Sequence, residues 1–308
     1  MPGPRGHLNA TLIALFVTFL WSSSWVLIRW GLDEEGLSPI TFASMRYGLA
    51  AMILLGWVAI QPRRRTELRS LDRKSMTWIL LLGVIFYAIT QGAQFVAIDS
   101  QPAATSSLIL SWTPLLVALA SSRSISEPVS GRQTLGALLV IAGAWTYFSG
   151  DLGATAIGVT ASIVGLLANV VGSLLGRHVN RPGNVSPLVV TALSMGIGSA
   201  ILVATGLVAE GVPAVSGRAL GIIVWLAVVN TAWAFTLWNL SLRRLSAIES
   251  AAINNTMLIQ IAVLAWIFLD ERIGVAEGAG ILLVTVGILL TQKILGRRPT
   301  PAESPLRR

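Results

Sequence analysis

Hydrophobic residues along this chain are grouped in long runs that short polar turns separate. Runs of about 20 apolar residues recur over the whole length, and a helix of that length crosses a hydrocarbon core of ~30 Å. The pattern predicts ten spans, at 9–28, 39–60, 76–98, 102–122, 132–149, 154–177, 185–208, 218–241, 246–268 and 274–295. The sequence therefore predicts an all-α integral membrane protein with ten transmembrane helices.

The chain contains an internal repeat. The stretch Pro102–Gly143 matches Ser246–Gly287 without gaps, at a shift of 144 positions. A corner glutamate and two glycines spaced seven apart recur in both copies: Glu127 and Glu271, Gly136 and Gly280, Gly143 and Gly287. Earlier in each half the shift is 148, where Ser38-Pro39 falls on Ser186-Pro187. A repeat of this length fixes the architecture before any other feature is considered.

Each half holds five predicted spans, an odd number, so the second half enters the membrane from the opposite side. We therefore predict two inverted repeats, 9–149 and 154–295, followed by a disordered cytoplasmic tail at 296–308. Inverted repeats are typical of secondary transporters, which bind substrate at the repeat interface and open to each side in turn. A duplicated fold that serves packing alone is the alternative.

Basic residues set the predicted orientation. The link between the second and third spans carries six of them, Arg63, Arg64, Arg65, Arg69, Arg73 and Lys74, which predicts a cytoplasmic link and cytoplasmic termini. The opposite face holds three, Arg29, Arg218 and Arg272, beside several acidic residues. The net charge of +8 therefore reflects topology and contact with anionic lipid, and we expect no nucleic-acid partner.

Composition excludes several kinds of site. The chain is 54% hydrophobic and 12% charged, with no cysteine and two histidines, so we expect no disulfide, metal centre or cofactor. It carries none of the HExxH, GxSxG or phosphate-loop patterns, and we expect no enzyme.

The two five-span halves also carry short motifs. These are Pro39-x6-Arg46 in the second span, Pro102-Ala-Ala-Thr-Ser-Ser and Trp112-Thr-Pro114 in the fourth, and the corner glutamates followed by Gly-x6-Gly. Together they resemble the EamA type of the drug/metabolite transporter superfamily over residues 9–295. The resemblance implies export of metabolites, and the arrangement is similar to that of bacterial inner-membrane exporters of amino acids.

Polar and aromatic residues at membrane depth nominate a substrate-binding cavity, because such groups are costly against lipid. Tyr87, Gln91 and Gln94 share one face of the third span, and their repeat mates are Thr231, Phe235 and Trp238. Trp21 and Trp25 of the first span match Asn169 and Ser173, and Ser111 matches Asn255. We predict a cavity without charge, lined by amides and aromatic rings. The alternative for each polar residue is an interhelical hydrogen bond.

Four further residues are predicted to act in gating or structure: Arg46, Pro114, Glu127 and Glu271. Arg46 either pairs with a substrate carboxylate or braces helix ends, and bracing is favoured. Pro114 removes a backbone donor and predicts a kink. The two glutamates are expected to satisfy donors in the loops. Glu249 is expected to favour the start of the ninth span.

We hypothesise a secondary transporter that exports aromatic and other neutral or hydrophobic amino acids, or related small metabolites, across the bacterial inner membrane. It would work by alternating access at a central cavity, as a monomer or weak homodimer. Because no carboxylate lies at the predicted midplane, export down the substrate gradient is favoured. The alternatives are a broad drug or metabolite exporter and a lipid-interacting membrane protein that transports nothing. Nucleotide sugars are disfavoured, because their phosphates would require several buried cations.

Overall fold

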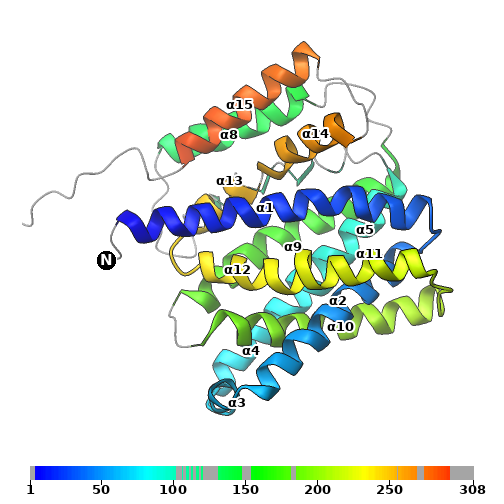
Figure 1. Ribbon diagram of the computed structural model, residues 1–308. Helices are drawn as coiled ribbons and strands as arrows, with labels where there is room; N and C mark the ends of the chain where they lie inside the picture. The colour runs from blue at the N-terminus through cyan, green and yellow to red at the C-terminus, as the bar shows by residue number, and fades with distance from the viewer. Residues whose placement is uncertain are drawn as a thin grey trace, which may run out of the picture.

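The structure is a computed structural model of the chain. It describes residues 4–101, 106, 109–110, 112–113, 116–117, 119–120, 131–147, 154–181, 185–254, 256–268 and 274–291. Every element in this part of the chain is a helix, which confirms the all-α prediction (Figure 1).

Six helical segments are long and apolar enough to cross a membrane, and they match predicted spans one, two, three, six, seven and eight. Four are single helices: α1 (Pro4–Asp33), α2 (Pro39–Ile60), α9 (Ala156–Asn180) and α10 (Pro187–Ala209). Two contain a π-helical turn, in the orders α4 (Arg73–Leu82), η1 (Gly83–Ile89), α5 (Thr90–Ser100) and α11 (Gly217–Ala227), η2 (Val228–Trp233), α12 (Ala234–Ser241).

The remaining predicted spans are described less completely. Spans five and ten are the shorter helices α8 (Gly131–Tyr147) and α15 (Val275–Thr291). The ninth span is described as α13 (Ala247–Asn254) and α14 (Thr256–Phe268), and the fourth only at scattered residues. The link predicted between spans two and three contains an additional short helix, α3 (Pro62–Arg69).

Side chains fix where several helices begin. Asp72 accepts a hydrogen bond from the Ser75 N–H over 3.1 Å, and Ser216 accepts one from Ala219 over 3.0 Å. Thr155 Oγ1 caps α9 in the same way by accepting from the Gly158 N–H over 3.0 Å. Such caps satisfy backbone donors that the first helical turn leaves without partners.

Hydrogen bonds between loops and helix termini show which termini lie together. At one end of the bundle the Glu210 carboxylate accepts from the N–H of Thr41 over 2.7 Å, and Thr155 donates to the Ser100 carbonyl over 3.0 Å. At the other end Arg243 donates to the Val185 carbonyl over 2.6 Å. Helix α1 ends at the first of these two ends, where it leads into α2, whereas α9 begins at that end beside Ser100. Consequently α1 and α9, which start the two halves of the chain, run in opposite directions.

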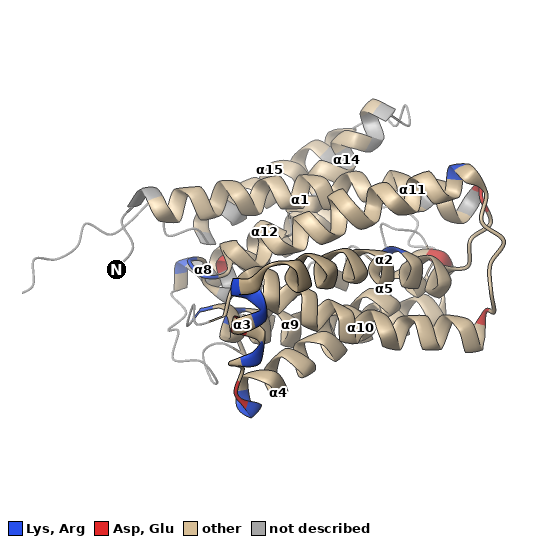
Figure 2. Cartoon of the chain, turned by 60° about the horizontal axis from the view of Figure 1, so that its bottom comes forward, with Lys and Arg blue, Asp and Glu red and all other residues tan. Residues whose placement is uncertain are grey.

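Charge differs between these two ends (Figure 2). Arginine and lysine gather around α3 and the start of α4, which we call the basic end. Acidic residues and Arg218 lie at the opposite end, where Glu34 pairs with Arg218 at 2.7 Å; we call this the acidic end.

The helices α8 and α15 pack along each other, as do α2 and α10 (Figure 1). A Cβ on Gly143 would lie 2.6 Å from the Val284 nitrogen, and one on Gly287 would lie 2.6 Å from the Gly136 carbonyl oxygen. The glycines of α8 and α15 therefore allow the backbones of these two helices to come into close contact, as small residues do between membrane helices.

Candidate functional site

A cavity lies between α1, α2, η1, α5, α9, α12, α13 and α14. Its empty volume is about 1080 Å³, counting the part that is open to solvent. Seven residues singled out in the sequence line it: Trp21, Trp25, Arg46, Gln91, Gln94, Asn169 and Phe235. The structure therefore brings together residues from both halves of the chain.

Arg46 supplies a buried cation to the cavity wall. The residue is 3% exposed, and its Nε donates to Thr231 Oγ1 over 2.7 Å. Its Nη2 contacts Ser24 Oγ at 3.5 Å and the Asn230 carbonyl oxygen at 3.4 Å. Among the residues that the structure describes, no carboxylate forms an ion pair with it. The prediction of a cavity without charge is therefore wrong.

The π-helical turn η2 builds the support for Arg46. Such a turn interrupts the regular hydrogen-bond ladder of an α-helix, and its carbonyl groups can accept from other elements. The Asn230 carbonyl accepts from the Trp21 indole over 3.1 Å as well as from Arg46. The Asn230 amide in turn donates to Ser23 and Ser24 Oγ, each at 3.0 Å. Helix α1 is thereby tied to η2 beside the cavity.

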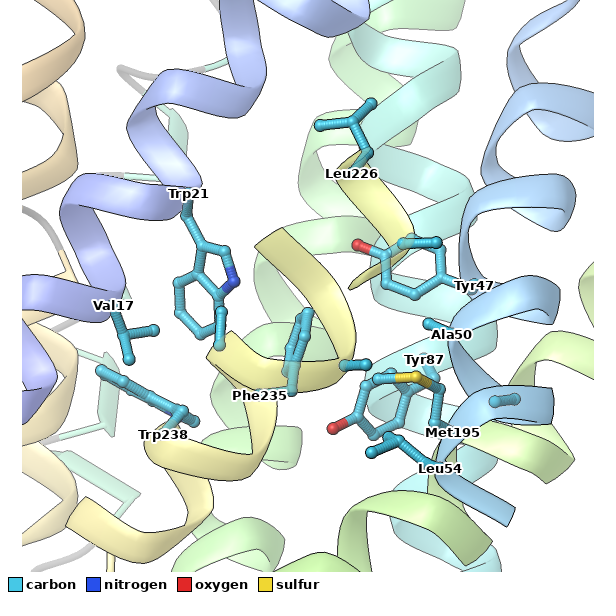
Figure 3. Packing of buried hydrophobic residues seen from close by; sticks show 14 of the residues in the cluster. Val17, Trp21, Tyr47, Ala50, Leu54, Tyr87, Met195, Leu226, Phe235 and Trp238 are labelled. Atoms are coloured by element: carbon cyan, nitrogen blue, oxygen red, sulfur yellow. The ribbon is translucent and has the colours of Figure 1, made fainter. Parts of the chain in front are cut away.

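Aromatic rings form part of the cavity wall, and Figure 3 shows Trp21 and Phe235 beside Trp238. The ring of Trp21 lies 4.7 Å from that of Phe235 and 5.1 Å from that of Trp238, measured between centroids. The ring centroid of Phe86 lies 6.1 Å from that of Phe235. Of these four, Trp238 is not among the lining residues and packs behind Trp21.

Four predicted lining residues lie elsewhere: Tyr87, Ser173, Thr231 and Trp238. Tyr87 lies within η1 and Thr231 within η2. A π-helical turn holds more residues than an α-helical one, so a face that is extrapolated with the α-helical period is wrong across these turns. Tyr87 is 1% exposed and packs on Phe235 at 5.1 Å, while Thr231 supports Arg46 instead of facing the cavity.

Five further predictions lie outside the described residues. They are Ser111 and Asn255 as lining residues, and Pro114, Glu127 and Glu271 as gating or structural residues.

Sequence reasoning missed several lining residues. Tyr47 follows Arg46 directly, and its hydroxyl donates to Gln91 Oε1 over 2.6 Å. The polar residues Ser24, Thr90, Ser162 and Asn254 also line the cavity, and their depth within predicted spans was a usable signal. Phe86, Phe95 and Ile28 gave no such signal, because apolar residues are common on every face of a membrane helix.

The bundle is closely packed between the cavity and the basic end. Leu242 and Leu245 are 3% and 0% exposed. Nearby, the carboxylate of Glu249 accepts from the Ser246 N–H over 2.8 Å, and Ser246 Oγ accepts from the Glu249 N–H over 3.2 Å. This capping box explains the acidic residue at the start of α13. His7 Nε2 of α1 lies 3.7 Å from the same carboxylate. The cavity lining extends toward the acidic end at Ile28 and Ala97, whereas these closely packed residues lie toward the basic end.

Comparison with known proteins identifies the family. The EamA-like transporter family matches residues 8–149 and 156–292. This chain belongs to the EamA-like transporter family. Membership establishes a multi-pass membrane transporter and not an enzyme, which confirms those two predictions, and it implies small-molecule substrates and contact with membrane lipids.

Several known transporters are similar to this chain, two of them over most of its length. The uncharacterized transporter YoaV of Bacillus subtilis is 22% identical, covering 92% of this chain and 96% of its own. A probable amino-acid metabolite efflux pump of Escherichia coli is 23% identical, covering 91% and 93%. An S-adenosylmethionine/S-adenosylhomocysteine transporter of Chlamydia trachomatis is 27% identical over a shorter part, 41% and 37%.

A solved crystal structure shares the fold. It superposes with a TM-score of 0.74 at 18% sequence identity and covers 95% of this chain and all of the other.

Proposed function

We propose that this EamA-like transporter exports neutral amino acids, or small metabolites that carry an amino-acid group, across the bacterial inner membrane. The observation that carries the proposal is Arg46. A guanidinium that is buried in a cavity wall, with hydroxyl and carbonyl partners but no carboxylate among the described residues, favours an anionic substrate group. A carboxylate pairs with arginine through two parallel hydrogen bonds.

The rest of the wall fits the remainder of such a substrate. Trp21, Trp25 and Tyr47 present aromatic faces, which attract an ammonium by about 0.5–2 kcal/mol. The same faces take an apolar side chain. The amides of Gln91, Gln94 and Asn169 can orient both charged groups of a zwitterion. The name of the Escherichia coli relative, a probable amino-acid metabolite efflux pump, agrees with this choice.

Alternating access between two inverted repeats is the mechanism that we propose. The turns η1 and η2 support it, because they begin at Gly83 and Val228, about one repeat apart. The opposite directions of α1 and α9 support it as well. In the orientation predicted from the basic residues, both termini are cytoplasmic, the basic end faces the cytoplasm, and the described cavity belongs to an outward-facing state.

The test is transport by the purified protein in liposomes. Vesicles preloaded with unlabelled phenylalanine should accumulate labelled phenylalanine by exchange, and protein-free vesicles should not. External phenylalanine and methionine should compete with the label. Phenylalaninamide, which keeps the ring and ammonium but lacks the carboxylate, should compete at least about tenfold less well, since a charge-assisted hydrogen bond contributes about 1.5–3 kcal/mol. Equal competition by the acid and the amide would refute recognition of the carboxylate by Arg46.

A further inference from the structure

A second pocket lies at the basic end, away from the central cavity. It has an empty volume of about 880 Å³, counting its open part. Its polar side chains are those of Arg63, Arg64, Glu67, Ser186 and Arg243, and Leu240 borders it. They come from α3, from the start of α10 and from the end of α12, so the pocket joins the link of the first half to two helices of the second.

The charges in this pocket are unbalanced. Three arginines and one glutamate give a net charge of 3 − 1 = +2. Arg64 is neutralised by Glu67 at 2.9 Å, and the other oxygen of Glu67 accepts from the Ser186 N–H. In the described part of the chain neither Arg63 nor Arg243 forms an ion pair.

Arg243 is the more constrained of the two unpaired cations. Its Nη2 donates to the Val185 carbonyl over 2.6 Å, which fixes the guanidinium, while its buried Nε has no hydrogen-bond partner among the described residues. Partial burial lowers the pKa of Arg243, and the Glu67 carboxylate acts in the opposite direction. A buried donor without an acceptor destabilises the protein, and either water or a ligand can supply that acceptor.

The position of the pocket indicates what that ligand is. The pocket lies where α2 ends and α10 begins, level with the membrane surface of a chain whose apolar helices cross the bilayer. Leu240 is 40% exposed beside it, so an apolar surface adjoins the cations. Basic pockets between membrane helices on this side of a protein suit the phosphate of a lipid headgroup.

We propose that this pocket binds a phosphate group between Arg63 and Arg243, and that the phosphate belongs to an anionic lipid headgroup. The phosphate oxygens accept from the guanidinium groups of Arg243 and Arg63, while the acyl chains lie along Leu240. A bound headgroup ties α3 to α10 and α12 at the basic end. The site is independent of the transported substrate.

The test measures lipid binding to the full-length protein in a neutral detergent, where no anionic surface attracts arginine in general. Dioleoylphosphatidylglycerol, dioleoylphosphatidylcholine and inorganic phosphate are titrated separately, with binding read by native mass spectrometry and by thermal stability. We expect the phosphatidylglycerol to bind at least about tenfold more tightly than the phosphatidylcholine. Arg243→Gln should weaken it about tenfold, and Arg63→Gln about fivefold.

Arg69→Gln is the matched control. Arg69 lies on α3 but outside the pocket, and its replacement removes the same charge as the pocket variants do. It should change the affinity less than twofold. Arg63 is exposed, so Arg63→Gln keeps the test decisive if Arg243→Gln fails to fold.

The three titrations separate the sources of phosphate. Stabilisation by inorganic phosphate that equals that by phosphatidylglycerol, and that both pocket variants remove, would support the phosphate site but overturn the lipid assignment. Equal affinity for the two lipids together with no phosphate effect, or equal losses in the pocket variants and Arg69→Gln, would overturn the site itself.

Discussion

Arg46 Nε donates a 2.7 Å hydrogen bond to Thr231 Oγ1, and this bond joins α2 to η2 in the wall of the central cavity. Arg46 belongs to the first half of the chain and Thr231 to the second. The hydroxyl orients the guanidinium together with Ser24 Oγ and the Asn230 carbonyl, so Arg46 and Thr231 are expected to act together on substrate binding.

Replacing Arg46 with Gln should raise the KM for phenylalanine about 10–100-fold, since a hydrogen bond to a charged group contributes about 1.5–3 kcal/mol. Thr231→Val keeps the shape and removes the hydroxyl, and should raise KM about 2–10-fold. Initial rates in liposomes measure both. Bracing, the other role considered for Arg46, makes a different prediction: lower abundance and thermal stability with an unchanged KM in the protein that remains.

The positions of the helices could be predicted from the sequence, because a run of apolar residues has to be as long as the membrane is thick. Which side chains face the cavity could be predicted where the helix is regular, as for Gln91 and Gln94 in α5. The prediction was wrong at Tyr87 and Thr231, because each lies in a π-helical turn. Such a turn depends on packing between helices and leaves no clear mark in the apolar pattern.

Arg46 shows a second limit of the sequence. Its burial could be predicted from its depth in the second span, but its role depends on which charges surround it. Its hydrogen bonds reach Thr231 and the Asn230 carbonyl, about 185 positions further along the chain, and Ser24, 22 positions before it. A partner of that kind is not visible from spacing within one helix.

Close packing of α8 on α15 should be sensitive to a single methyl group. Gly143→Ala would place a Cβ 2.6 Å from the Val284 nitrogen and 2.7 Å from the Gly280 carbonyl oxygen, so the two backbones have to separate. We expect a loss of about 1–3 kcal/mol, as for other overpacked sites. Thermal unfolding of the purified protein in detergent measures it.

Gly278→Ala is the matched control for this pair of helices. Gly278 lies on α15 with no atom within 4 Å of the position that a Cβ would take. Alanine also favours the helix there, so stability should be equal or slightly higher. Equal losses in both variants would mean that the close contact does not stabilise the protein.

The orientation can be tested with single cysteines, because the chain has none of its own. Thr66→Cys places a thiol on α3 at the basic end, and Val212→Cys places one after α10 at the acidic end, where Val212 is 86% exposed. A membrane-impermeant maleimide added to intact bacterial spheroplasts should label Val212→Cys and should label Thr66→Cys only after lysis. The reverse pattern would place the basic end outside.

Glu67 should make stability depend on pH. Partial burial acts to raise its pKa, but hydrogen bonds from Ser186 and Arg64 outweigh this and hold the pKa of the carboxyl below its ordinary value. A carboxyl with a lowered pKa in the folded state contributes stability above its unfolded pKa, and this contribution is lost as the pH falls through the folded pKa.

Glu67→Gln should therefore lower the melting temperature at neutral pH, and the difference from the unmodified protein should shrink at acidic pH. Thermal unfolding as a function of pH measures this difference. A constant difference over the whole range would mean that the charge of Glu67 does not contribute.

Trp21 and Trp238 lie 5.1 Å apart, yet they should have different effects on selectivity. Trp21 lines the cavity, whereas Trp238 packs behind it and is 7% exposed. Trp21→Ala removes the aromatic wall that a large side chain would contact, and an apolar wall discriminates by about 1–3 kcal/mol. Its transport of phenylalanine should therefore fall more than that of threonine, by a ratio of about 5–100.

Trp238→Ala should act through packing instead. Removal of a buried Trp side chain costs about 3–5 kcal/mol, so membrane abundance should fall, while the ratio of phenylalanine to threonine transport per molecule stays within about twofold of the original. Trp21→Phe separates the ring from the indole donor: it keeps an aromatic wall but loses the 3.1 Å bond to the Asn230 carbonyl. It should preserve the preference for phenylalanine and raise KM. If Trp21→Ala and Trp238→Ala shift the ratio equally, the wall that selects the side chain is not Trp21.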